Sequence, residues 1–309
     1  MLKFISQRLI MLVITLWVVV TLTFFLMHAI PGDPFTKEGK QPPQIKENLM
    51  KHYGLDKPLP MQYVSYLGNL MKGDFGPSFS SKTLTVNDII FNNFPVSARL
   101  GFQALIISIT LGLTLGIIAS LKHNSFLDYT AMVIAVLGVS VPNIVLAPLL
   151  INVFAAKLHW FPIATWGTFK HTVLPSIALG MLSMAVIARL MRSNMLEVLG
   201  QDYIRTAKSK GLSSFQVVWR HTIRNAIMPV ITILGPLTAT LLTGTFVVEK
   251  IFAIPGLGKY FIQSVTNRDY PVILGTTIFY SMVLISLNFL VDIAYGLIDP
   301  RVKVGLKGE

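Results

Sequence analysis

The side chains best suited to specific binding lie in a polar island, residues 191–225, between two long apolar runs. Phe215 and Trp219 stand in this island among many cations. Its basic residues, set against only Glu197 and Asp202, are Arg192, Arg205, Lys208, Lys210, Arg220 and Arg224. Trp, Phe and Arg are typical of protein-binding hot spots. The island therefore predicts contact with a soluble partner.

The sequence in the middle of the island predicts the start of a helix. Ser213 can act as the N-cap by accepting a hydrogen bond from the backbone N–H of Gln216, whose side chain can reach back to the Ser213 N–H. Leu212 and Val217 occupy the two positions of a hydrophobic staple. These signals agree with one another and predict a short helix that begins at Ser213.

Beyond the cap, apolar residues follow the spacing of one α-helical face. They are Phe215, Val218, Trp219, Thr222 and Ile223. The opposite side carries Gln216, Arg220 and Arg224. A second helix, about Gln201–Lys210, precedes them, and Gly211 suits the left-handed position after its end. Two interpretations stay open: a helix pair on anionic lipid, or a helix presented to a groove on a soluble partner.

The composition places these helices in a membrane protein. Of the 309 residues, 53% are hydrophobic and only 13% are charged, and the mean hydropathy is +0.63. Such values lie outside the range of soluble globular proteins. The net charge of +12 fits retention of Lys and Arg on the cytoplasmic side, so no nucleic-acid partner is expected. Because cysteine is absent, disulfides and Cys-bound metals are excluded.

The fold class expected is an all-α polytopic membrane protein with six transmembrane helices. Each apolar run has close to the roughly 20 residues that cross the bilayer as a helix. The runs are Leu9–Ile30, Leu100–Leu121, Thr130–Phe154, Thr172–Leu190, Ile227–Val248 and Val272–Leu297. The first is too long for a signal peptide and lacks a cleavage site. Lys3 and Arg8 before it favour a cytoplasmic N-terminus, and six spans then put both termini in the cytoplasm.

Two regions follow from this topology. Residues 1–99 form the first span plus a large extracytoplasmic loop, and residues 100–309 form a five-helix core that contains the cytoplasmic loop 191–226. The large loop is patterned, because two sets of its apolar residues share helical faces. These sets are Tyr63, Leu67 and Leu70, and Val86, Ile89, Ile90 and Phe94. The loop is either a scaffold of interfacial helices or a docking surface for an external partner.

The spans contain few ionisable residues, and His28, Arg189 and Asp292 all lie near span ends. This argues against an ion-coupled transporter or a membrane enzyme with buried acid–base groups. Small residues instead favour close helix packing, as at Gly112 and Gly116 and again at Ser176 and Gly180. Local breaks in helical hydrogen bonding are expected at four prolines. They are Pro142, Pro148, Pro175 and Pro236.

Motifs for chemistry are missing. The chain has no G-x-x-x-x-G-K-[ST] loop, no H-E-x-x-H and no G-x-S-x-G. The expectation is a non-catalytic protein with no catalytic residues, no bound cofactor and no metal. If the chain pumps, a partner supplies the energy.

Six segments, in order along the chain, resemble the B-type permease subunit of bacterial oligopeptide and dipeptide ABC importers. They are Phe25–Pro34, Tyr53–Pro58, Gly73–Gly76, Asp202–Leu212, Arg220–Val230 and Asp299–Arg301. The resemblance implies a type I ABC importer permease fold in the bacterial cell membrane. Ala207 and Gly211 match the Ala and Gly of the cytoplasmic "EAA" loop of these permeases. Arg205 stands where the general pattern has Glu, and the proline of the loop comes later, at Pro229.

The resemblance also implies partners. They are a second homologous permease, two ATPase subunits that bind ATP and Mg, and an extracytoplasmic peptide-binding protein that delivers the peptide. The helix after Gly211 would be the coupling helix that enters a groove of the ATPase. The expected coupling residues are Ala207, Gly211, Leu212, Ser213, Phe215, Gln216, Val218, Trp219 and Arg220.

The function expected is half of the translocation path of an ATP-driven oligopeptide importer. An importer of the same family for dipeptides, nickel or a metallophore, or glutathione is the alternative. A self-contained channel or secondary transporter is the third hypothesis, and it needs a gating or ion-binding element within the spans.

Overall fold

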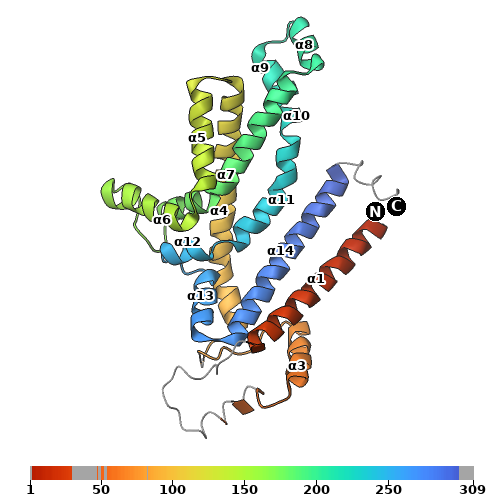
Figure 1. Ribbon diagram of the computed structural model, residues 1–309, viewed down its shortest axis with the longest axis vertical. Coiled ribbons are helices and arrows are strands. Elements are labelled where there is room, and N and C mark those ends of the chain that lie inside the picture. Colours follow the sequence, from red (N-terminus) through yellow and green to blue (C-terminus); the bar gives the residue numbers. More distant parts are fainter. Residues whose placement is uncertain (1, 30–46, 48–49, 52–53, 82, 299–309) are drawn as a thin grey trace. The chain divides into compact units, whose positions relative to one another are not determined.

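The computed structural model describes residues 2–29, 47, 50–51, 54–81 and 83–298, and these residues are almost entirely helical (Figure 1). Among them, the only β interaction is an isolated bridge between Pro77 and Thr85. The all-α class expected from the sequence is therefore confirmed.

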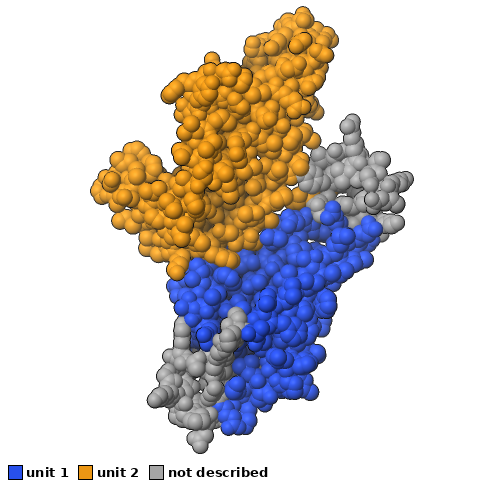
Figure 2. Space-filling model, viewed as in Figure 1, with its two compact units in different colours: residues 1–97, 255–289 blue, residues 98–254, 290–309 orange. Residues whose placement is uncertain are grey.

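The chain divides into two compact units (Figure 2). Unit 1 comprises residues 1–97 and 255–289, and unit 2 comprises residues 98–254 and 290–309. The division expected at residue 99 follows chain order, whereas unit 1 combines the N-terminal segment with a much later one. Two long helices, α4 (Val86–Leu121) and α14 (Tyr270–Ile298), contribute residues to both units.

Unit 1 contains α1 (Leu2–Ala29), α3 (Leu59–Met71) and α13 (Leu257–Asn267), with the start of α4 and most of α14. A hydrogen bond of 2.6 Å between Thr21 Oγ1 and Tyr63 Oη joins α1 to α3. The helical face expected at the start of α4 is confirmed, since Val86, Ile89 and Ile90 are buried.

Asp269, just before α14, fixes the loop that follows Pro77. Its carboxylate accepts hydrogen bonds from Ser78 Oγ at 2.5 Å, from the Phe79 N–H at 3.0 Å and from the Ser80 N–H at 2.9 Å. Only 2% of the residue is exposed. Burial of a carboxylate is costly unless donors surround it, and these three donors satisfy that requirement.

Unit 2 is built around α7 (Phe169–Leu199), which packs against α4 and α5 (Phe126–Ser140). Added Cβ atoms at Gly112 and Gly116 would lie 2.8 Å or less from α7 atoms, so only glycine permits this approach. Further along, Ser108 Oγ donates to the Gly180 carbonyl at 2.8 Å. The close packing expected from the small residues is confirmed.

Five helical segments in the described residues are long and apolar enough to cross a membrane. They are Ser6–Ala29, Val86–Leu121, Phe169–Leu199, Met228–Ile251 and Tyr270–Val291. The fourth of these joins α11 (Met228–Thr243) to α12 (Phe246–Ile251). The span expected at Leu100–Leu121 is the second half of a longer helix, because the buried face that begins at Val86 continues directly into the apolar run.

The expected span Thr130–Phe154 is wrong as a single helix. Helix α5 ends at Ser140, and α6 (Asn143–Leu150) with the π-helix η1 (Ile151–Lys157) continues after a bend of 117°. The cause is Pro142, which lacks an N–H and forces the preceding residue out of the helical region. Val141 accordingly has φ −95° and ψ 113°. The pair is either one broken span or a re-entrant segment, which gives five or six spans in all.

One buried carboxyl corrects the expectation of spans almost without ionisable groups. Glu249 lies within the segment Met228–Ile251 and is fully buried. The apolar run was expected to end at Val248, so Glu249 was placed outside the span. In the structure, α12 follows the break at Gly244 and continues the apolar segment beyond Val248, so that it includes Glu249.

Candidate functional site

The polar island folds into a compact group of short helices at the end of α7, where Figure 1 shows α8 and α9 together. The helices are α8 (Asp202–Ser209), α9 (Ser214–Gln216), the π-helix η2 (Val217–Ile223) and α10 (Arg224–Ala226). The two helices expected from the sequence are both present, although the second has an unexpected form.

The turn after α8 has the predicted glycine geometry. Gly211 has φ +81°, in the left-handed region that glycine adopts most easily. Its N–H donates to the Lys208 carbonyl at 3.0 Å, and the Leu212 N–H donates to the Ala207 carbonyl at 3.4 Å. These two bonds form a Schellman motif. Gly211 therefore reverses the chain so that the next helix folds back on α8.

A small apolar cluster holds that arrangement. Ile204, Ala207 and Val217 are buried together, and Leu212 packs against them. Ala207 is only 6% exposed. It therefore packs inside the island and does not belong to its outer surface, whereas the staple expected between Leu212 and Val217 is confirmed by their shared cluster.

The capping box is confirmed. Ser213 Oγ accepts from the Gln216 N–H at 3.3 Å, and Gln216 Oε1 accepts from the Ser213 N–H at 3.1 Å. Both side chains are engaged in capping the helix. They contribute to the site by fixing the residue at which the helix begins.

The apolar face expected after the cap is partly wrong, because residues 217–223 form a π-helix. Its hydrogen bonds run five residues back, so residues five apart align. Val217 and Thr222 point inward with at most 1% exposure, and Thr222 Oγ1 donates to the Val217 carbonyl at 3.2 Å. Phe215 and Trp219 instead face outward, with exposures of 71% and 57%. Val218, grouped with them from the sequence, is half-buried.

The outward aromatic pair belongs to an island that is rich in exposed cations. The ring centroids of Phe215 and Trp219 are 6.1 Å apart. The exposed cations of the island are Arg205, Lys208, Lys210, Arg220 and Arg224. Arg205 lies 3.8 Å from Asp202, but both side chains are largely solvated, so this pair is weak. Exposed aromatic rings in a cationic island form a surface suited to an acidic or amphipathic groove.

Polar contacts attach this surface to the long helices of unit 2. Asn225 Nδ2 donates to Tyr203 Oη at 3.2 Å, which joins α10 to α8. Asn194 Nδ2 donates to the Ala226 carbonyl at 3.3 Å, which joins α7 to α10. Met191 and Met195 of α7 pack in one buried cluster with Ala226. These contacts connect the short helices of the island to the long helix α7.

Sequence reasoning missed one ion pair. Arg192 was counted with the cations of the island, but its guanidinium contacts Asp128 at the start of α5, with Nε–Oδ1 at 2.6 Å and Nη2–Oδ2 at 2.7 Å. No spacing signal links residues so far apart in the chain. The contact ties the base of the island to a second helix.

Among the described residues, no group of three or more His, Asp or Glu side chains is arranged to hold a metal ion.

Comparison with known families identifies the family to which the chain belongs. Residues 112–304 match the family described as "Binding-protein-dependent transport system inner membrane component", and residues 1–101 match its N-terminal companion family. The chain belongs to this permease family. The permease is a multi-pass inner-membrane component and a non-catalytic subunit, which confirms both expectations.

Full-length relatives agree with the family. The permease is 54% identical over 308 residues to the dipeptide transport system permease protein of Bacillus subtilis, with 100% of both chains covered. It is 45% and 43% identical over 305 residues to the oligopeptide transport system permease proteins of Haemophilus influenzae and Escherichia coli K12. Each of these two alignments covers 98% of this chain and 100% of the relative.

Solved structures show the fold. A chain of an amino acid ABC transporter matches with a TM-score of 0.52 at 20% identity, covering 67% of the permease and 92% of that chain. A chain of a methionine ABC transporter, crystallised in inward-facing conformations, matches with a TM-score of 0.52 at 16% identity. That match covers 66% of the permease and 95% of the methionine transporter chain. The membrane helices thus have the fold of ABC importer permeases.

Proposed function

We propose that this permease is half of the translocation path of an ATP-driven importer of short peptides. The observation that carries the proposal is 54% identity over the full chain to a dipeptide transport permease, with oligopeptide transport permeases at 43–45%. Dipeptides are therefore the first substrates to test, with longer peptides next. The bent pair α5–α6 counts as one span, so that six spans leave both termini in the cytoplasm, as in a type I importer.

The complex requires partners. A second homologous permease completes the path, two ATPase subunits bind ATP and Mg, and an extracytoplasmic binding protein delivers the peptide. Binding proteins and ATPases are implied by the family description. The permease itself binds no cofactor in this scheme.

The Phe215–Trp219 surface is the coupling element. The two rings are exposed in an island rich in cations, while the buried residues of the same helices attach them to α7 and α11. Closure of the ATPase pair moves this surface, and the rigid packing behind it carries the motion to the spans. Gly211 and Ser213 set the direction of the helix, and Phe215, Trp219 and Arg220 make the contact.

The test is uptake of a labelled dipeptide by proteoliposomes that contain the complete complex. Trp219→Glu places a carboxylate in the contact and is expected to lower uptake by more than about tenfold. Gln201→Glu is the matched control, since it adds the same charge to an exposed position of the island. Membrane insertion and thermal stability should be equal in both variants. Wild-type uptake by the Trp219→Glu complex would refute the coupling role.

A further inference from the structure

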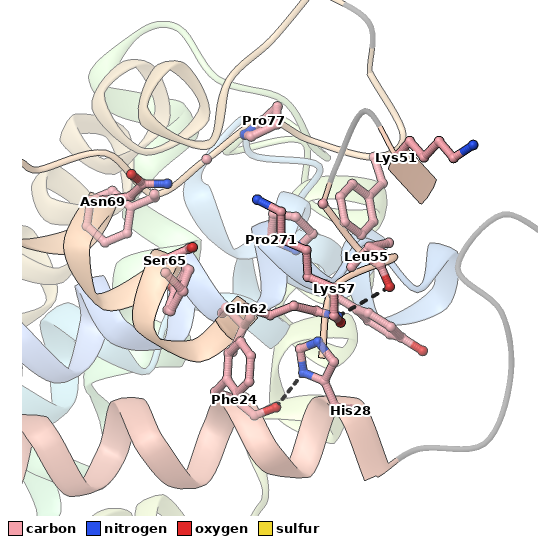
Figure 3. Close-up of a pocket in the computed structure, with 17 residues that line it drawn as sticks. Phe24, His28, Lys51, Leu55, Lys57, Gln62, Ser65, Asn69, Pro77 and Pro271 are labelled. Atoms are coloured by element: carbon pink, nitrogen blue, oxygen red, sulfur yellow. Dashed lines mark hydrogen bonds between the residues drawn. The ribbon is translucent and has the colours of Figure 1, made fainter. Parts of the chain in front are cut away.

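A cavity of about 390 Å³ lies within unit 1 (Figure 3). Its walls are the end of α1, one face of α3, the loop at residues 75–79 and the first turns of α14. Gln62, Ser65, Tyr66 and Asn69 supply the α3 face at the spacing of neighbouring helical turns. Ligand pockets commonly measure about 300–1,000 Å³, so this cavity is large enough for a few residues of peptide.

The cavity is strongly aromatic. Phe24, Phe75, Phe79 and Tyr270 line it together with Tyr66. The Phe24 ring lies 4.2 Å from the His28 ring and 5.9 Å from the Tyr66 ring, measured between centroids. Burial raises the pKa of the Tyr66 phenol, which therefore stays neutral. Such walls favour an apolar or aromatic side chain.

The charged part of the lining is basic. Lys51 and Lys57 line the cavity together with His28, and none of the described lining residues is acidic. Lys51 pairs with the exposed Glu47 at 2.7 Å, which leaves Lys57 as the principal cationic group of the lining. His28 Nδ1 lies 2.8 Å from the Phe24 carbonyl, visible as a dashed line in Figure 3. That oxygen can only accept, so Nδ1 carries the hydrogen and Nε2 is the second hydrogen-bonding atom of the ring.

Glu47 and Asp56 both act on Lys51, and the exposed Asp56 is next to Lys57 in the chain. Two further carboxylates of unit 1 are held by their own loops. Asp269 is buried against Ser78 and the backbone of residues 79 and 80, and Asp74 accepts from the Gly76 N–H. Each is used by its own loop. A segment that carries a carboxylate beside an apolar side chain therefore complements the lining.

Most of the lining comes from the region with its own N-terminal family, residues 1–101. The solved importer permeases cover only 66–67% of this chain while using more than nine-tenths of their own length. Under the proposed topology, the end of α1 lies outside the cytoplasm. The cavity is thus an extracytoplasmic feature of a region that the family describes as part of a binding-protein-dependent system.

We propose that this cavity is an anchor site for the extracytoplasmic binding protein. It receives a short segment with an aromatic or branched apolar side chain next to an acidic residue. The apolar side chain fills the aromatic pocket, and the carboxylate meets Lys57. Pocket-filling anchors dominate the affinity of many interfaces, while charges at the rim steer association. This inference rests on the proposed function, because it assumes an importer fed by a binding protein.

The experiment measures the affinity of the purified cognate binding protein, loaded with dipeptide, for the complete importer in lipid nanodiscs. Ser65→Trp fills the cavity from an exposed position of α3, and Lys57→Glu reverses a lining charge. Met61→Trp on the same helix and Lys72→Glu just after it are exposed controls outside the cavity. The two cavity variants should weaken binding about tenfold, and the controls should change it less than about twofold.

Basal ATPase activity and thermal stability should be unchanged in all four variants, which excludes misfolding. Unchanged binding in both cavity variants would overturn the proposal. Binding of labelled dipeptide to the importer without any binding protein, lost in Ser65→Trp, would also overturn it, because the occupant would then be free peptide. Peptide uptake by the wild type is measured in parallel. If it is absent while the cavity variants still lose affinity, the transport assignment fails and the docking site stands.

Discussion

Asp128 and Arg192, 64 positions apart in the chain, meet through both oxygens of the carboxylate. The carboxylate also accepts from the Asn124 N–H at 3.0 Å, and His123 Nδ1 lies 3.2 Å from it. Only 3% of the Asp128 side chain and 24% of the Arg192 side chain are exposed. The pair therefore connects the first turn of α5 to the C-terminal part of α7, the helix that leads into the island.

Removal of one partner from this pair should destabilise the permease. Asp128→Ala leaves a poorly solvated guanidinium without its carboxylate, at an expected cost of about 2–4 kcal/mol. Arg192→Met leaves the buried carboxylate with fewer donors and should also lower stability. The measurement is the thermal midpoint of the purified protein in detergent. The double variant should lose less than the sum of the two single changes, and strict additivity would contradict direct coupling.

Gly116→Ala should force α4 and α7 apart. An added Cβ would lie 2.6 Å from the Ala188 carbonyl oxygen, and this backbone atom cannot rotate away. Overpacking of this kind costs about 1–3 kcal/mol. The matched control is Gly167→Ala, where the nearest atom would be 3.8 Å away. The thermal midpoint should fall for Gly116→Ala alone; equal midpoints would mean that the helices do not pack this closely.

Gly211→Ala should disturb the island through backbone conformation alone. No atom lies within 4 Å of an added Cβ, but φ is +81°. A left-handed non-glycine residue costs about 1–2 kcal/mol. Gly211→Asn should be milder, since asparagine tolerates this region better. Limited proteolysis of the island should speed up in the order wild type, Asn, Ala. Gly68→Ala on α3 offers equal space without positive φ and should not change cleavage.

Ser213→Ala should loosen the start of the helix that carries Phe215 and Trp219. It removes the acceptor for the Gln216 N–H, at a cost of about 1 kcal/mol. Ser213→Asp keeps an acceptor and should retain the helix start. The readout is hydrogen exchange of residues 213–223, expected to be about fivefold faster in the alanine variant. Ser214→Ala changes the exposed neighbouring serine as a control, and equal exchange in both alanine variants would show that the cap is not used.

The sequence was informative wherever the deciding contacts are local. The capping box joins Ser213 to Gln216 three residues away, and Gly211 closes its turn through residues only three and five positions apart. These interactions need no distant partner, so residue type and spacing were sufficient to predict them. The same holds for the long apolar helices, whose length and composition match the bilayer.

The tertiary structure decided everything that depends on distant partners. The π-helix at 217–223 turns Val217 inward because Ile204 and Ala207 of another helix complete its cluster. This register aligns the buried Thr222 with Val217 and separates it from Phe215 and Trp219, with which an assumed α-helical period had grouped it.

The sequence by itself determined a helical membrane permease with a capped, basic island. The break at Pro142 was also expected, but tertiary structure alone determined the partner of Arg192 and the cavity between α1, α3 and α14. The physical reason is the range of the interactions. Caps, turns and hydrophobic periodicity act within one or two helical turns, whereas ion pairs, close helix approach and cavities arise only when segments far apart in the chain pack together.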